Sequence, residues 1–92
     1  MSELTIAVET GRTTMEEIQP GLDAALKEEF PGGMLKWRWE EDVLHLWGPG
    51  AKATIVMSDG RLVGHAELGP PANLMRPVIE KKIARVMKKA AD

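Results

Sequence analysis

The residues best suited to chemistry in this 92-residue sequence are its two histidines and the acids near them. His45 and His65 each lie in a stretch where polar and apolar residues alternate, which is the pattern of a strand. Both imidazoles are therefore expected on the same face of neighbouring or near-neighbouring strands, where a pair could bind a metal ion. Glu67 has the right parity to be a third ligand. Without a more complete ligand set, we expect solvated histidines and no metal site.

Other groups that catalyse reactions do not come together in the sequence. Catalysis needs a nucleophile beside a base, paired carboxylates or a metal, and the chain has no cysteine. The run Ser58–Gly60 has the composition of a turn, and Glu40–Asp42 that of a solvated hairpin tip. Gly48–Lys52 lacks both the spacing and the following helix of a phosphate-binding loop. We therefore expect neither an enzyme nor a bound cofactor.

The composition predicts one folded domain over residues 1–92. Hydrophobic residues make up 43% and charged residues 28%, as in ordinary globular proteins. The N-terminus lacks the basic start of a signal peptide, and no apolar run approaches the roughly 18 residues that span a bilayer. With no cysteine and a net charge of −2, we expect a cytoplasmic protein without a transmembrane segment or affinity for nucleic acid.

The first two elements are a strand and a helix. Glu3–Glu9 alternates apolar and polar residues, which predicts a strand with one buried face. Two overlapping capping boxes, Thr13-x-x-Glu16 and Thr14-x-x-Glu17, predict the start of a helix that continues to Phe30. Pro20 interrupts that helix, because proline removes an interior hydrogen bond. We expect one kinked helix; the alternative is a short turn followed by a separate helix.

The middle of the chain predicts two hairpins. Leu35–Trp39 and Asp42–Trp47 alternate, and a loop of Glu40 and Glu41 would place Trp37 opposite Leu44 and Trp39 opposite Asp42. A second pair of strands, 51–57 and 61–68, is joined by a turn that contains glycine. The two indoles Trp37 and Trp39 then face the core, on the side opposite to their basic neighbours.

A second helix is expected from about Asn73, as N-cap, to Ala90. Its apolar side includes Met75, and its opposite side carries five bases: Lys81, Lys82, Arg85, Lys88 and Lys89. The fold class is thus α+β, with the order β-α-β-β-β-β-α, a single antiparallel sheet and both helices on one face. The other face of the sheet is expected to be open.

That open face is a candidate interaction surface. Its expected residues include an exposed tryptophan in an apolar patch, which is typical of interfaces. The surface consists of Val43, His45, Trp47, Val56, Val63 and His65. The five bases of the last helix are a second candidate, for an anionic polymer, lipid headgroups or an acidic partner, including the acidic first helix of another copy; the alternative is a solvated helix face.

Several segments resemble one known family. The string Trp37–Leu46, together with Ala53-x-Ile55, Glu67–Gly69 and Ile79-Glu80-x-x-Ile83, is similar to the polyhydroxyalkanoic acid system proteins, small bacterial proteins encoded near polyester granule genes. The resemblance covers nearly the whole chain and implies a β-α-β4-α domain similar to one repeat of the TATA-binding-protein fold. It implies a granule-associated or regulatory accessory protein, with no enzymatic activity to transfer. The chain departs from the family at Pro20-Gly21 and at Gly64.

These observations together predict a non-enzymatic accessory or binding protein. The partner would be a polyhydroxyalkanoate granule surface or another protein, contacted through the open face around Trp47 or through the basic helix. One alternative is a carrier of a small apolar ligand between sheet and helices, suggested by six methionines. Another is a module that forms homodimers through the open sheet face.

Overall fold

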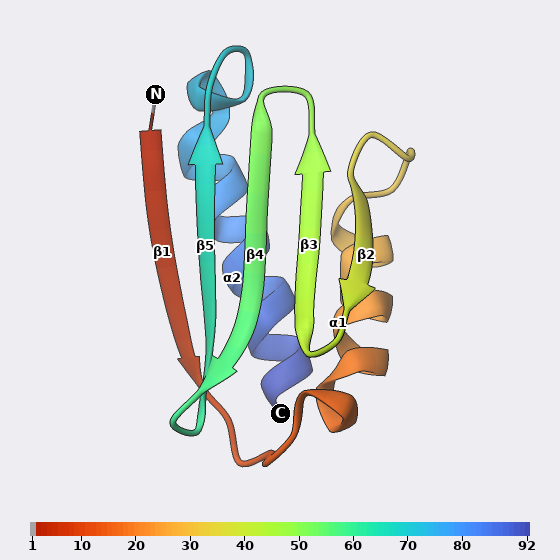
Figure 1. The fold of residues 1–92 in the computed structure, drawn as a ribbon. Helices are drawn as coiled ribbons and strands as arrows, with labels where there is room; N and C mark the ends of the chain where they lie inside the picture. The colour runs from red at the N-terminus through yellow and green to blue at the C-terminus, as the bar shows by residue number, and fades with distance from the viewer. Residues whose placement is uncertain (1) are drawn as a thin grey trace.

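The elements of the structure follow the predicted order, with one short 3₁₀ helix added. A computed structural model describes residues 2–92 (Figure 1). Its elements are β1 (Ser2–Glu9), α1 (Met15–Glu29), β2 (Lys36–Glu40), β3 (Val43–Gly48), β4 (Ala51–Ser58), β5 (Arg61–Leu68), the 3₁₀ helix η1 (Ala72–Met75) and α2 (Arg76–Ala91). The predicted α+β class is therefore confirmed.

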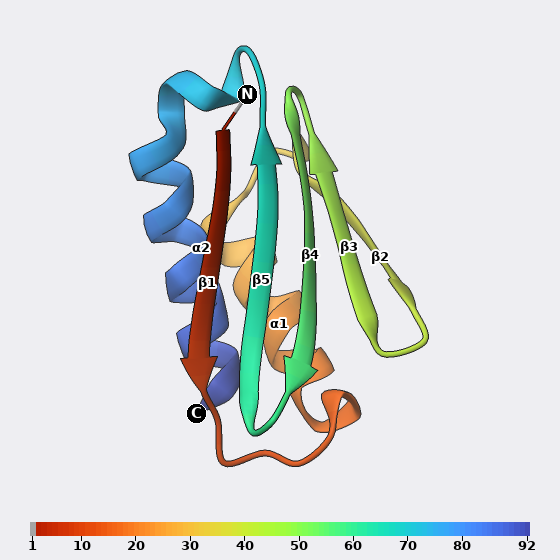
Figure 2. The ribbon, with the colours of Figure 1, turned by 60° about the vertical axis from the view of Figure 1, so that its left-hand side comes forward.

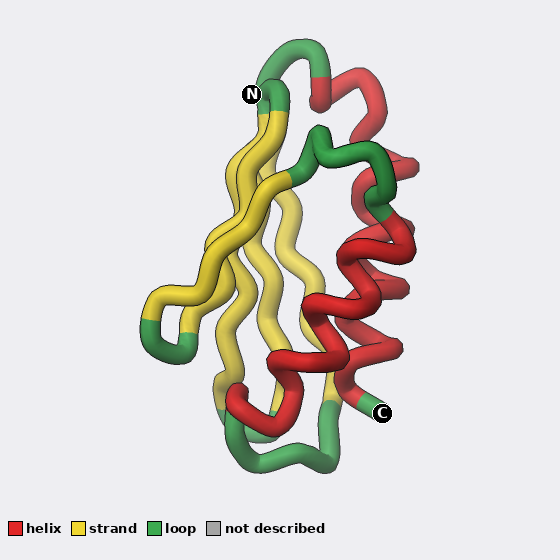
Figure 3. Tube along the Cα trace, turned by 90° about the vertical axis from the view of Figure 1, so that its right-hand side faces the viewer, coloured by secondary structure: helices red, strands yellow, loops and turns green. Residues whose placement is uncertain are grey.

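The five strands form one antiparallel sheet in the order β1-β5-β4-β3-β2. Both helices lie on the same side of this sheet and pack against each other (Figures 2 and 3). No element of residues 2–92 covers the opposite side. The prediction of one covered and one open face is confirmed, as strands with a single apolar face require.

The core lies between the helices and the covered face of the sheet. Leu22 and Leu26 of α1, Met87 of α2, and Leu44, Ile55 and Leu62 of the sheet are almost completely buried. These sheet residues have the strand parity that the sequence assigns to the core. Alternation along each strand therefore sets which face of the sheet is apolar.

Helix α1 begins with a capping box. The Thr14 hydroxyl accepts a hydrogen bond from the backbone N–H of Glu17, whose carboxylate accepts one from the Thr14 backbone N–H in return. The Thr13 hydroxyl donates to the same carboxylate at 2.9 Å. Pro20 lies inside the helix, which continues without a break to Glu29. The alternative of a turn and a separate helix was wrong.

The predicted register of the first hairpin was also wrong, although its faces were right. Glu40 pairs with Val43, so Glu41 and Asp42 form the loop and Trp37 lies opposite Leu46 rather than Leu44. Aspartate is a poor strand residue and a good turn residue, which favours leaving Asp42 in the loop. The shift is two residues, so every side chain keeps its predicted face.

The start of the last helix differs from the prediction as well. Asn73 lies inside η1 and does not cap α2, which begins at Arg76 with Pro77 in its first turn. Proline is favoured in the first turn of an α-helix, where its missing N–H costs no hydrogen bond, so Pro77 favours a start of α2 close to itself. Met75 is consequently outside α2 and exposed, not packed in the core.

Candidate functional site

The six residues of the predicted interaction surface do lie together on the open face. A polar row crosses its centre. It consists of residues that lie side by side on four neighbouring strands, in the order Thr5, His65, Thr54 and His45. The next row is apolar, with Val63 opposite Val56. The surface as predicted consists of Val43, His45, Trp47, Val56, Val63 and His65, and the valines are half-buried.

The two histidines lie on the open face with one strand between them. Thr54 of β4 lies between His65 of β5 and His45 of β3. Adjacent strands are about 4.8 Å apart, so the two histidine backbones are separated by two such spacings. Among the described residues, the metal-ligand group that the geometry brings together joins His65 to Glu3 and Glu67 and does not include His45.

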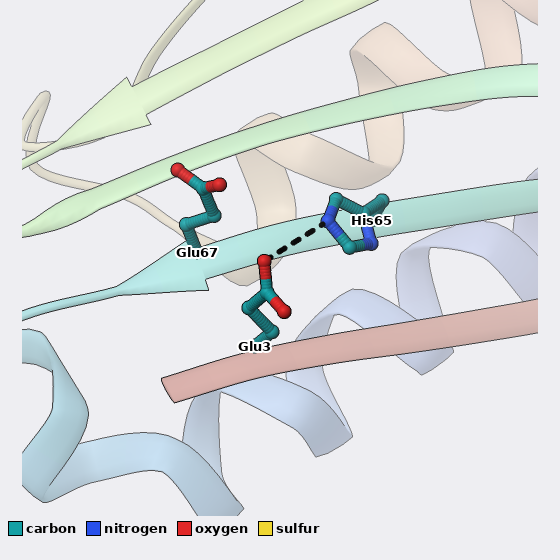
Figure 4. Close-up of side chains that lie close together, drawn as sticks. All are labelled: Glu3, His65 and Glu67. Atoms are coloured by element: carbon teal, nitrogen blue, oxygen red, sulfur yellow. Dashed lines mark ion pairs between the residues drawn. The ribbon is translucent and has the colours of Figure 1, made fainter. Parts of the chain in front are cut away.

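His65 lies near two carboxylates of the same face, those of Glu3 and Glu67 (Figure 4). One ligand atom each from Glu3, His65 and Glu67 can be chosen so that all lie within 4.8 Å of one another. His65 Nε2 is 3.9 Å from Glu3 Oε1, and its Nδ1 is 3.1 Å from the Thr5 hydroxyl. The three groups could hold a divalent cation, but a tetrahedral site with bonds of about 2.0 Å needs closer ligand atoms.

Sequence reasoning found Glu67 and missed Glu3. Glu3 of β1 lies directly opposite Glu67 because β1 pairs with β5, a strand that is distant from it in the sequence. Strand alternation gives the face of a residue but not the neighbour of its strand. All three side chains are exposed, so water competes for every ligand position. The expectation that no metal ion binds here stays a prediction.

The basic face of α2 is partly neutralised by α1 of the same chain. Lys89 Nζ is 2.9 Å from Glu28 Oε1 and 3.3 Å from Glu29 Oε2, and Arg85 is 3.3 Å from Glu29 Oε1. Lys82 donates to the backbone carbonyl of Glu29 at 3.1 Å. Helix α1 of the same chain thus supplies acidic partners for this face, and binding of a separate acidic partner stays a prediction.

These contacts shift the ionisation of the residues involved. Partial burial raises the pKa of Glu29, but the hydrogen bonds and charges of Lys89 and Arg85 outweigh it, so the pKa is lowered overall. The Glu28 hydrogen bond is the main reason that the pKa of Lys89 is raised. Lys81 and Lys88 form no ion pair within residues 2–92.

One end of the molecule is distinctly apolar. It is formed by the α1–β2 loop (30–35), the β3–β4 turn (49–50) and the segment 69–75, which lie together at the top of Figure 1. None of these three segments contains a charged residue. The large hydrophobic side chains that are exposed belong to this end or border it: Met34 (71% exposed), Trp47 (40%), Leu74 (81%), Met75 (53%) and Val78 (44%).

The opposite end of the sheet is polar. Its loops are residues 10–14, 41–42 and 59–60, and they contain Arg12, Glu41, Asp42 and Asp59 but no large apolar side chain. The molecule therefore has an apolar end and a polar end. Its longest dimension is 36 Å. We call the first the apolar end: residues 30–35, 49–50 and 69–75 with Trp47 and Val78.

A groove opens beside the apolar end, between the covered face of the sheet and α2. It encloses about 350 Å³ and is lined mainly by apolar side chains. Leu46, Ala53 and Ala66 form its floor, and Ile79 and Ile83 of α2 form one wall. The chain from Phe30 to Leu35 forms the other wall. This groove is where the carrier hypothesis requires a cavity, between sheet and helices.

The apolar end was not predicted from the sequence. The available signal was Met34 after Pro31-Gly32-Gly33, and Leu74-Met75 between Pro70-Pro71 and Pro77. Apolar residues between closely spaced prolines and glycines have no long helix or strand to bury them. Met75 was instead predicted on the apolar side of the last helix, where the core would have buried it.

Architecture and surface together define a small α+β domain with one uncovered sheet face and one apolar end. Within that class, the chain belongs to the polyhydroxyalkanoic acid system family: residues 6–90 match the family described as "putative polyhydroxyalkanoic acid system protein". The resemblance noted on the sequence is thus confirmed. No curated protein matches the chain. Neither helix of residues 2–92 has the length and apolar character needed to cross a membrane.

Proposed function

We propose that this protein is a non-enzymatic accessory protein of the polyhydroxyalkanoate system, and that it docks on the hydrophobic surface of the polyester granule through its apolar end. In this proposal the protein is cytoplasmic and collects at the granule surface. The proposal rests on the family and on one structural observation. That observation is the gathering of Met34, Trp47, Leu74, Met75 and Val78 at one end of the molecule.

Burial of these side chains supplies the binding energy. Removing an exposed Leu, Met or Val side chain from water contributes roughly 1.5–3 kcal/mol. The segments that carry Met34, Leu74 and Met75 contain no charge that would have to leave water with them. Trp47 pairs with Lys36 and Lys52, and Val78 follows Arg76, so these two lie at the edge of the uncharged region. The opposite end, with Arg12, Glu41, Asp42 and Asp59, stays solvated when the apolar end is docked. An amphipathic molecule of this kind binds an apolar surface in one orientation.

The open sheet face suits such a surface less well. Its valines are already half-buried by their neighbours, and the same face carries Glu3, Glu67, Lys52 and Arg38. Docking this face on a polyester would take those charges out of water. The open face, with His45 and His65, is better matched to a protein partner or a second copy, which stays a prediction.

Co-sedimentation with purified polyester granules tests the proposal. Leu74→Ser and Met34→Ser remove two of the most exposed apolar side chains and should reduce the bound fraction at least several-fold, each alone and more so together. Val63→Ser, on the open face, is the matched control and should bind like wild type. Circular dichroism checks that all variants are folded. Equal loss with Val63→Ser, or binding unaffected by Leu74→Ser and Met34→Ser, would refute the assignment of the apolar end.

A further inference from the structure

The groove beside the apolar end exists because α1 is too short to cover the whole sheet. The helix ends at Glu29, and the chain then runs through Pro31-Gly32-Gly33 to β2 (Figure 3). Beyond that point the loop, η1 and α2 stand over the covered face. Beside the groove the covered face carries the small residues Ala53, which is half-buried, and Ala66, which is buried, whereas the rest of the core has Leu44, Ile55 and Leu62. Small side chains at these positions leave the space empty.

The groove differs from ordinary packing defects in this fold. The gap deeper in the core, near Leu26 and Val86, holds only about 10 Å³. The groove encloses about 350 Å³, within the range of about 300–1,000 Å³ for small-molecule sites. A cavity of this size with Leu46, Ile79 and Ile83 in its lining fits an aliphatic chain.

Lys82 gives the groove a charged side. Lys82 is one of two charged residues in the groove lining, and the other, Lys52, also borders the open face. The Lys82 ammonium donates to the Glu29 carbonyl at 3.1 Å and lies 5.3 Å from the centre of the Phe30 ring. Its neighbours Arg85 and Lys89 are paired with glutamates, whereas Lys82 forms no ion pair in the described part of the chain. An ammonium has three donors, so Lys82 can still bind an anion.

We propose that the groove binds a single unbranched aliphatic chain with a carboxylate head, the chain lying between Ala53 and Ile83 and the head paired with Lys82. The ligand class follows from the apolar lining and from the uncompensated charge of Lys82, which complements an anion. The groove shares Met34 and Trp47 with the apolar end, but Ala53 and Lys82 line the groove alone, and Leu74, Met75 and Val78 belong to the apolar end alone. This binding site therefore goes beyond granule docking, and either activity can be lost without the other.

Titration with decanoate, below its micelle-forming concentration, tests the proposal. The methyl NMR signals of Ile79, Ile83 and Leu46 in the wild-type protein should shift in a saturable way. Decanol, which has the same chain without the charge, should bind about tenfold more weakly. Decyltrimethylammonium should bind more weakly still. No saturable shift, shifts confined to Leu74 and Val78, or equal binding of decanol would overturn the proposal.

Two pairs of variants locate the ligand. Ala53→Leu fills the groove and should weaken decanoate binding at least tenfold, whereas Ala7→Leu makes the same change on the open face and should not. Lys82→Met keeps the aliphatic stem and should abolish the preference for decanoate over decanol, whereas Lys81→Met should keep it. If Ala53→Leu does not fold, the wild-type NMR shifts and the Lys82 pair still decide the question. Granule binding should survive both groove variants, which separates failure of this site from failure of docking.

Discussion

The indole Nε1 of Trp39 donates a hydrogen bond to the Asp23 carboxylate at 3.0 Å, and this bond joins the edge strand β2 to helix α1. Trp37 Nε1 donates to the same oxygen at 3.1 Å. Asp23 thus satisfies both indoles of a strand that pairs with only one neighbour. We expect Asp23→Ala to lower the free energy of unfolding by about 1–3 kcal/mol, because two part-buried donors lose their acceptor.

Denaturant unfolding followed by tryptophan fluorescence measures this effect. Asp23→Asn keeps an acceptor oxygen and should cost less than Asp23→Ala. Glu16→Ala removes a solvent-exposed acid from the same helix and serves as the control. If Asp23→Ala is no more destabilising than Glu16→Ala, the two indole bonds do not contribute to stability.

Gly50 holds two loops of the apolar end together. It has a φ of +75°, and a Cβ at this position would lie 2.6 Å from the carbonyl oxygens of both Gly69 and Pro70. The Gly69 N–H donates to the Gly50 carbonyl at 2.7 Å. Gly50→Ala should therefore be destabilising by about 1–3 kcal/mol from backbone strain alone, and by more from the clash.

Gly60 provides a matched control for Gly50. It has the same φ of +75°, but a Cβ there would meet nothing within 4 Å. Gly60→Ala therefore measures the cost of the backbone conformation without the clash. Thermal unfolding should rank the two variants with Gly50→Ala clearly less stable, and a similar melting temperature for both would show that the loop contact is easily relieved.

Acid should weaken the cap of α1. The hydroxyls of Thr13 and Thr14 donate to the Glu17 carboxylate and, together with the Thr13 backbone N–H, lower its pKa below the ordinary 4.5. A lowered folded-state pKa adds stability that is fully present above the unfolded-state value and is lost as pH falls through the folded-state value. Wild type should therefore exceed Glu17→Gln in stability at neutral pH, and the difference should shrink below pH 4.5.

Unfolding titrations at several pH values check this prediction. Glu16→Gln, in the same helical turn, removes a carboxylate that accepts no hydrogen bond from the two threonines. Its difference from wild type should depend less on pH. A Glu17→Gln difference that stays constant down to pH values well below the ordinary pKa of glutamate would contradict the role of the charge.

Alternation along the strands was enough to predict which residues face the core, because burial of one face depends only on parity. It correctly placed Leu44, Ile55 and Leu62 inside and Trp47 outside. Neighbour relations between strands were not predictable in this way. The pairing of β1 with β5, which brings Glu3 to Glu67, is a contact between distant parts of the chain. The first hairpin's register also depended on loop chemistry that the three adjacent acids Glu40, Glu41 and Asp42 left ambiguous.

Gly64, one of the two departures from the family pattern, is explained only by tertiary packing. A Cβ at this position would lie 3.0 Å from the sulfur of Met87, which is completely buried against β5. The strand pattern alone suggests a weak point. The same limitation applies to the apolar end, because the exposure of Met34 and Leu74 depends on where α1 ends and where Pro77 lets α2 begin.

Salt dependence separates the apolar end from the basic helix as the granule contact. Three of the five bases on the basic face of α2, Lys82, Arg85 and Lys89, already contact Glu28 or Glu29. Only Lys81 and Lys88 are left without such a contact in residues 2–92. Exposed charges are screened by salt, whereas burial of apolar surface is not. Granule binding through the apolar end should therefore persist at high salt.

The double variant Lys81→Ala/Lys88→Ala makes this comparison specific. If docking depends on Leu74 and Met34, the double variant should bind granules within about twofold of wild type, since exposed ion pairs contribute little. Leu74→Ser should bind several-fold less at low and high salt alike. The reverse pattern, with binding lost in the lysine variant and released by salt, would move the contact to the basic face of α2. Because α1 neutralises most of that face, we expect the apolar pattern.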